Sequence, residues 1–190
     1  MEEENRRASP LAGAPGYEIR FLPTGRGREY LMGLWNGRAG RFELDEIYSN
    51  LAEDALTFAD GVRRVLLHTT RKLPGGGYRV GCYEPGRGWL AEGEHLHMER
   101  IRIPAGDGKA AETFLLWAYD GKEGQNAYRH RLYDGEDRLI GVFESVSLSG
   151  EPYEEIDYRT EGGRLVFQEK TDGRPLFEAA LQQEVETEDV

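Results

Sequence analysis

Glycine-containing turns recur at short intervals from residue 74 to residue 174, and this spacing restricts the chain to a fold of short strands. Glycine adopts positive φ at little cost, and Asp-Gly and Pro-Gly pairs favour tight turns. The segments between the turns are rich in Tyr, Phe, Ile, Val and Thr, which is typical of a β-sandwich or β-barrel. The turn sequences are PGGG (74–77), PGRG (85–88), AGDG (105–108), DGKEG (120–124), DGED (134–137), SGEP (149–152), EGG (161–163) and TDGR (171–174).

The alternation of apolar and polar residues predicts strands along most of the chain, and residues 29–43 and 89–103 are long enough to bend or split. Residues 45–59 differ, because Ile47, Leu51, Ala55 and Phe58 follow a helical spacing that predicts a short helix, with a hairpin as the alternative. Closure of a meander removes exposed edges. We therefore expect an all-β fold, a single antiparallel β-barrel of about 8–10 strands with one short helix. The predicted strands are 17–22, 29–43, 63–72, 78–84, 89–103, 110–119, 126–133, 138–148, 153–160, 164–170 and 175–185.

Length and charge limit the organisation and the class of partner. A chain of 190 residues fits one domain, here expected at 17–185 between a disordered N-terminal arm (1–16) and an acidic disordered tail (186–190). The net charge of −11 disfavours a nucleic-acid partner. The sequence has no long apolar run, no apolar secretion signal at its N-terminus and one cysteine, Cys82. These features predict a cytoplasmic protein without membrane spans, in which Cys82 is a small buried residue.

A carboxylate interrupts an otherwise apolar face in residues 138–148. Period-two spacing places Glu144 with Ile140, Val142, Val146 and Leu148. Burial would raise the pKa of the Glu144 carboxyl and suit it to general acid or base chemistry near neutral pH. An ion pair with an arginine, or simple exposure, is the alternative interpretation.

The preceding segment, AYRHRLY (127–133), could bring further polar groups to Glu144. It places Tyr128 and His130 on one face and Arg129 and Arg131 on the other. A three-residue hairpin loop with a bulge would set Tyr128 opposite Glu144, whereas a two-residue loop would set it opposite Phe143. The arginine face could instead point inward and serve an anionic ligand.

The stretch GEHLHMERI (93–101) places His95, His97 and Glu99 on one face of a continuous strand. Together with His130, the two histidines could bind a metal ion, in a pattern that partly resembles cupin barrels. The alternatives are a pocket without metal and a solvated edge strand. Aromatic residues, including Trp35, Trp117 and Tyr119, could line a pocket for a flat ligand or form ordinary core.

Several segments resemble known barrel proteins. GLWNG (33–37) is similar to the Gly-x-Trp near the first strand of lipocalin-like (calycin) barrels. LHMERIRIP (96–104), LLWAYDG (115–121) and AYRHRLYDGEDRLIGVFESV (127–146) look like the middle strands of phycobiliprotein lyase-like calycins. This resemblance implies a ligand-holding calycin barrel closed at one end by Trp35, with Tyr128, Arg129 and Arg131 near the chromophore pocket.

These observations lead to a small-molecule-binding barrel with an apolar or aromatic ligand and no cofactor. In this hypothesis it is an isomerase, cyclase or lyase, with Glu144, His130 and Tyr128 catalytic. The alternatives are a cupin-like metal-dependent enzyme using His95, His97 and His130, and a non-catalytic binding or chaperone protein. The oligomeric state, including a homodimer, is left open. The expected ligand-binding residues are Trp35, Trp117, Tyr119, His97, Glu99, Arg129 and Arg131.

Overall fold

The computed structural model describes residues 7–104, 113–122 and 124–181. It confirms the all-β class, because the described residues form antiparallel sheets with one four-residue helix, α1 (Pro152–Glu155). Hydrogen bonds join the described strands into four separate sheets, and no closed barrel is found among them. The chain also divides into two compact units where the sequence predicted one domain at 17–185.

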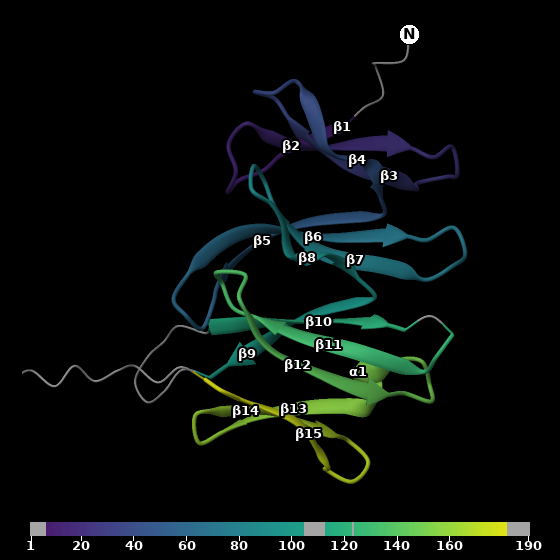
Figure 1. Ribbon diagram of the computed structural model, residues 1–190. Helices are drawn as coiled ribbons and strands as arrows, with labels where there is room; N and C mark the ends of the chain where they lie inside the picture. Colours follow the sequence, from purple (N-terminus) through teal and green to yellow (C-terminus); the bar gives the residue numbers. More distant parts are fainter. Residues whose placement is uncertain (1–6, 105–112, 123, 182–190) are drawn as a thin grey trace, which may run out of the picture. The chain divides into compact units, whose positions relative to one another are not determined.

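The N-terminal unit comprises the described residues up to Leu56 together with Arg63–Met98. Its two sheets have the strand orders β1-β2-β3-β4 and β5-β6-β7-β8, drawn from purple to teal in Figure 1. Leu34, Leu44 and Leu67 belong to its buried core. The strands are β1 (Arg7–Pro10), β2 (Tyr17–Pro23), β3 (Tyr30–Asn36), β4 (Arg41–Tyr48), β5 (Asn50–Thr57), β6 (Arg63–Lys72), β7 (Tyr78–Glu84) and β8 (Gly88–His95).

The C-terminal unit comprises Thr57–Val62 and the described residues from Glu99 onward. One sheet has the order β12-β11-β10-β9 and the other the order β13-β14-β15 (Figure 1). Ile101, Leu115 and Phe167 belong to its buried core. The strands are β9 (His97–Ile103), β10 (Thr113–Gly121), β11 (Ala127–Tyr133), β12 (Leu139–Val146), β13 (Ile156–Glu161), β14 (Arg164–Glu169) and β15 (Pro175–Ala180).

Many strands lie where the alternation pattern predicts them. β6 and β7 have the predicted bounds. The segment 29–43 splits into β3 and the start of β4, and 89–103 splits at Leu96 between β8 and β9. β10 has Leu115, Leu116, Trp117, Ala118 and Tyr119 all buried, as expected of a central strand whose two faces are both apolar.

Several local predictions are wrong, and the predicted strand 153–160 begins as the helix α1, with strand only from Ile156. Residues 7–10 form β1, which pairs with β2, so the predicted disorder of 1–16 does not hold there. Residues 45–59 contain no helix, because the chain bends at Ser49 between β4 and β5, which belong to different sheets. The helical spacing of their apolar residues therefore arises from two strands, and Ile47 is exposed. The tail at 186–190 lies outside the described residues.

Candidate functional site

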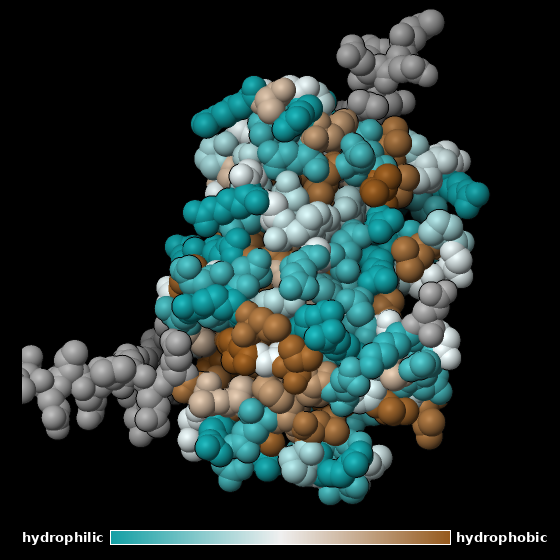
Figure 2. Space-filling model, viewed as in Figure 1, coloured by the Kyte–Doolittle hydropathy of each residue, from teal (hydrophilic) through white to brown (hydrophobic). Residues whose placement is uncertain are grey.

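The C-terminal unit contains a pocket of about 440 Å³ whose wall is mainly apolar. Leu139 and Ile140 contribute exposed apolar surface to it. Figure 2 shows brown, hydrophobic residues gathered where the β9–β12 sheet lies in Figure 1. The described lining residues are Ala59, Asp60, Ile103, Thr113, Leu115, Asp134, Arg138, Leu139, Ile140, Ala180 and Leu181.

A bulge in β12 brings two consecutive apolar side chains to this pocket. Tyr133 pairs with Leu139 and Leu132 pairs with Gly141, so Ile140 is the extra residue. Successive residues of a regular strand point to opposite faces, but a bulge re-aims one of them. Leu139 and Ile140 can therefore both line the same wall.

The β11–β12 hairpin supplies the polar end of the pocket. One carboxylate oxygen of Asp134 accepts hydrogen bonds from the backbone N–H groups of Glu136 (3.0 Å) and Arg138 (2.9 Å). The other accepts from Arg138 Nε at 2.7 Å. Asp134 is buried, and these three bonds compensate for the loss of water around its charge.

A second carboxylate, from Asp60, reaches the same end on the segment 57–62. The Ala59 N–H donates to the Phe114 carbonyl at 2.9 Å, which attaches this segment to β10. The hairpin then lies against it so closely that a Cβ on Gly135 would fall 2.8 Å from Asp60 Oδ1 and 2.7 Å from Phe58 Cβ. Asp60 Oδ1 accepts from the Val62 N–H at 3.2 Å, and Arg138 Nη2 lies 3.7 Å from Asp60 Oδ2.

Apolar walls with a few convergent polar groups are typical of small-molecule sites. Sequence reasoning missed Asp60, Asp134 and Arg138. The DGED turn contained the signal for Asp134, because an Asp at the start of a turn accepts bonds from the turn's own N–H groups. Nothing in the local sequence connects Asp60 to that turn, since the contact spans more than seventy residues.

The predicted site residues Trp117, Tyr119, Tyr128 and His130 do come together, but they form packed core. All four are buried. Tyr119 lies 5.8 Å from Tyr128 and 5.1 Å from His130, measured between ring centroids. None of the four lines the 440 Å³ pocket, and we therefore regard them as the interior of the C-terminal unit.

Hydrogen bonds explain how this core holds a histidine. Trp117 Nε1 lies 3.1 Å from His130 Nδ1, and His130 Nε2 lies 2.7 Å from Ser145 Oγ. Indole N–H can only donate, so Nδ1 must accept and the ring proton sits on Nε2. Nε2 then donates to Ser145. In this tautomer His130 cannot take a proton from the serine, so the pair is not a nucleophile with its base.

The premise for Glu144 is wrong. Its side chain is 58% exposed and lies 2.7 Å from Lys122 Nζ. The hydrogen bond and charge of Lys122 lower the pKa of the Glu144 carboxyl, where burial would have raised it. The strand pairing explains the difference. Asp134 pairs with Arg138 through the backbone, as the three-residue loop requires, but the bulge shifts the register so that Tyr128 faces Ser145 and Arg129 faces Glu144.

The same shift reverses the faces of β12. The residues predicted to point inward, Ile140, Val146 and Leu148, are exposed, while Phe143 is buried. Arg129 is exposed opposite Glu144, and Arg131 lies 3.3 Å from Asp120. The arginine face is therefore occupied by carboxylates of the same sheet.

The His-x-His stretch does not form one strand face, because a bend at Leu96 interrupts the strand and separates β8 from β9. His95 is buried and its Nε2 donates to the Ala91 carbonyl at 2.5 Å. His97 and Glu99 are half-buried at the start of β9. The described residues contain no group of three His, Cys, Asp or Glu side chains that could hold a metal ion.

The bond from His95 spans a three-residue bulge in β8. Ala91 and Glu92 have φ of 56° and 63°, and Gly93 has 115°. The bulge lies over Gly81, where a Cβ would come 2.9 Å from the Gly93 carbonyl oxygen. Backbone strain of this kind is often found at functional sites, which makes the side chains around the bulge a second candidate.

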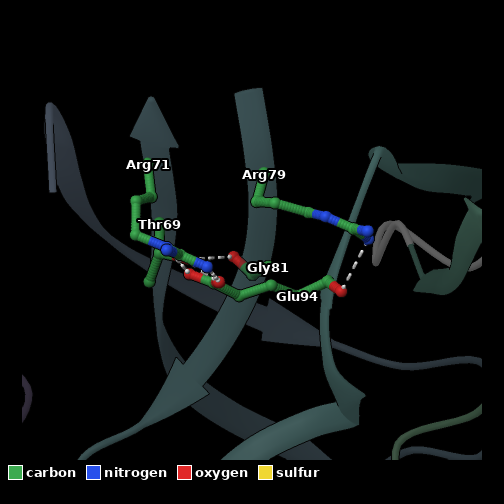
Figure 3. Close-up of polar contacts among 5 residues, drawn as sticks. All are labelled: Thr69, Arg71, Arg79, Gly81 and Glu94. Atoms are coloured by element: carbon green, nitrogen blue, oxygen red, sulfur yellow. Dashed lines mark hydrogen bonds and ion pairs between the residues drawn. The ribbon is translucent and has the colours of Figure 1, made fainter. Parts of the chain in front are cut away.

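Figure 3 shows that Glu94 contacts both arginines beside the bulge. Arg71 Nη2 lies 2.6 Å from Glu94 Oε2, and Arg71 Nε donates to the same carboxylate at 3.0 Å. Arg79, directly opposite Arg71 in the β6–β7 pair, donates to the Glu94 backbone carbonyl at 3.4 Å. Thr69 donates to the Gly81 carbonyl on the next strand. The Glu94 carboxylate therefore pairs with Arg71 and the Glu94 backbone carbonyl accepts from Arg79, contacts that suit a structural role.

Two further arrangements in the N-terminal unit are structural. Arg20 stacks on Trp35 at 3.7 Å from the ring centroid, so Trp35 packs on a sheet surface. Cys82 Sγ lies 3.3 Å from His68 Nδ1, and His68 Nε2 lies 3.5 Å from Asp54. No local sequence pattern connects these three residues, which lie on different strands. Cys82 is fully buried, as expected, and a substrate cannot reach its sulfur.

Comparisons with known proteins return no matching family model, no matching curated protein and no matching solved structure. No helix among the described residues is long and apolar enough to cross a membrane.

Proposed function

We propose that this chain binds a small, mainly apolar molecule in the pocket of the C-terminal unit. The observation that carries the proposal is a pocket of about 440 Å³ that combines an apolar wall with two carboxylates, each 9% exposed, and one guanidinium at one end. Its volume is within the range of small-molecule sites, roughly 300–1,000 Å³.

The apolar wall supplies the affinity in this proposal. Leu139 and Ile140 are 49% and 37% exposed, and each would lose contact with water when a ligand covers it. Burial of apolar surface contributes about 25 cal/mol per Å² before the costs of association are subtracted. The adjacent Ile103 and Leu115 belong to the packed core, so this part of the pocket wall is rigid.

The test uses benzyl alcohol as a neutral probe and follows the methyl NMR signals of Ile103, Leu115 and Leu139. We expect saturable shifts of these signals at millimolar concentrations. Ala180→Trp should abolish the shifts, because Ala180 lines the pocket and an indole would fill it.

The matched control is Ala39→Trp, the same change on an exposed turn of the other unit. It should leave the titration unchanged. Binding that survives in Ala180→Trp, or signals that do not shift at all in the unmodified chain, would contradict the proposal.

A calycin-type barrel and an isomerase, cyclase or lyase activity stay predictions. The residues proposed for that chemistry, His130 and Glu144, are respectively engaged in the core and exposed. We therefore assign the pocket a binding role, and turnover of a bound molecule would extend it.

A further inference from the structure

Among the residues that the structure describes, the polar end of the pocket carries an excess of negative charge. Asp60 and Asp134 provide two carboxylates, and their side chains are each 9% exposed. Arg138 provides one guanidinium, 59% exposed. The formal sum of these three groups is −1, and the two carboxylates are much less accessible to water than the cation that faces them.

The two carboxylates differ in how well they are satisfied. Asp134 accepts three hydrogen bonds, two from backbone N–H groups and one from Arg138 Nε. From the described residues Asp60 accepts one, from the Val62 N–H to Oδ1. Asp60 Oδ2 is buried and has no hydrogen-bond partner within the described part of the chain, since Arg138 Nη2 is too distant at 3.7 Å.

A buried carboxylate oxygen without a donor is costly, because it has lost water and gained no hydrogen bond in return. The remaining donors of Arg138 do not remove this cost, since its Nε is held by Asp134 at 2.7 Å. A donor brought by the ligand would remove it. A positively charged donor would also neutralise the excess charge of the site.

We propose that the ligand of this pocket carries a protonated amine, which displaces the exposed guanidinium of Arg138 from beside the buried Asp60 Oδ2, donates to that oxygen, and covers Leu139 and Ile140 with its apolar body. This inference rests on the proposed binding function and specifies its ligand class. A ligand with a carboxylate would meet two negative side chains and is excluded on charge. A neutral donor would satisfy Oδ2 but leave the charge uncompensated.

The experiment compares benzylamine, benzyl alcohol and benzoate on the full chain at pH 7, by the methyl NMR titration described above. The three probes share one ring and differ in the charge of the polar group. We expect benzylamine to bind about tenfold more tightly than benzyl alcohol, which corresponds to about 1.4 kcal/mol, and benzoate to bind most weakly.

Asp60→Asn should reduce the advantage of benzylamine to less than about twofold, because the amide keeps an acceptor for the Val62 N–H but removes the charge. Asp45→Asn, an exposed position in the other unit, is the matched control and should keep the full advantage. Arg138→Gln should increase the advantage, because the formal charge at the polar end falls from −1 to −2.

The outcomes separate the two proposals. Equal binding of benzylamine and benzyl alcohol, or tightest binding of benzoate, would overturn the amine while leaving the apolar pocket in place. An advantage that persists in Asp60→Asn, or that falls in Arg138→Gln, would also overturn it. Absence of binding by all three probes would overturn the pocket itself. If Asp60→Asn no longer binds benzyl alcohol either, the preference for benzylamine is judged from the unmodified chain and from Arg138→Gln.

Discussion

Trp117 Nε1–H donates a hydrogen bond to His130 Nδ1 at 3.1 Å, and this bond determines which nitrogen of the buried imidazole carries the proton. The other nitrogen, Nε2, donates to Ser145 Oγ at 2.7 Å. His130 also stacks on Phe143, with ring centroids 4.4 Å apart and planes inclined by 3°. A side chain that sequence reasoning placed in a catalytic role is thus a connector between two strands and the aromatic core.

We predict that Trp117→Phe lowers the free energy of unfolding, because His130 Nδ1 loses its donor while remaining buried. The cost of an unsatisfied buried acceptor is about 1–3 kcal/mol, to which the smaller ring adds a cavity. Urea denaturation followed by circular dichroism measures it. Trp35→Phe, on the half-buried surface of β3, is the control and should cost less than half as much.

Gly141→Ala should destabilise the C-terminal unit, because the new methyl group would overlap the ring of Phe177. We expect a loss of about 1–3 kcal/mol, as for other overpacking substitutions. Gly75→Ala is the matched change, since a Cβ at Gly75 meets nothing within 4 Å. Thermal melting of the two variants should differ clearly. If Phe177→Leu does not partly restore Gly141→Ala, the steric explanation is wrong.

Glu92→Gly should stabilise the N-terminal unit. Glu92 is exposed and has a φ of 63°, a conformation that glycine adopts without strain. The gain should be about 0.5–1 kcal/mol, set by the strain removed less the extra freedom of glycine in the unfolded chain. Glu136→Gly, at an exposed position without positive φ, should instead be neutral or destabilising. Chemical denaturation of both variants decides the point.

Glu43 should make the stability of the N-terminal unit depend on acid pH. Burial opposes its ionisation, but hydrogen bonds from Asn36, Gly86, Tyr17 and Tyr83 outweigh this and lower the pKa of its carboxyl. The stabilisation is therefore fully present above the unfolded-state value, about 4.3, and is lost as the pH falls through the lower folded-state pKa.

In Glu43→Gln the melting temperature should fall less steeply from about pH 5 to about pH 3 than in the unmodified chain, because the protonation step at this site is gone. At pH 7 the variant should be less stable, since the charge-assisted bonds are lost. Glu136→Gln serves as the exposed control. Parallel pH profiles for Glu43→Gln and the unmodified chain would show that Glu43 does not titrate as described.

The strand pattern was predictable because glycine turns and period-two alternation are local signals. β6 and β7 have their predicted bounds, and β10 is buried on both faces as its composition implies. Residues 45–59 were not predictable from the same signals, because two strands in different sheets imitate the spacing of one helix.

The site was much less predictable, for two physical reasons. A single extra residue, Ile140, moves Glu144 from the face of Tyr128 to the face of Arg129, and a one-residue shift of register reverses every side chain that follows it. The pocket also depends on contacts between distant segments, such as Gly135 with Asp60. Neither the bulge nor such a contact can be recognised from the local alternation of apolar and polar residues.

Residues 57–62 belong to the C-terminal unit, although the chain on both sides of them belongs to the N-terminal unit. This arrangement has a consequence during synthesis on the ribosome. All segments of the N-terminal unit have left the ribosome once Met98 has emerged. Phe58 can pack only later, after Phe114, its bridge partner on β10, has been synthesised. A nascent chain halted in this interval would present a large aromatic side chain that later becomes fully buried. Cutting the gene at residue 98 would make the exposure permanent, so independently expressed halves should aggregate unless they are produced together.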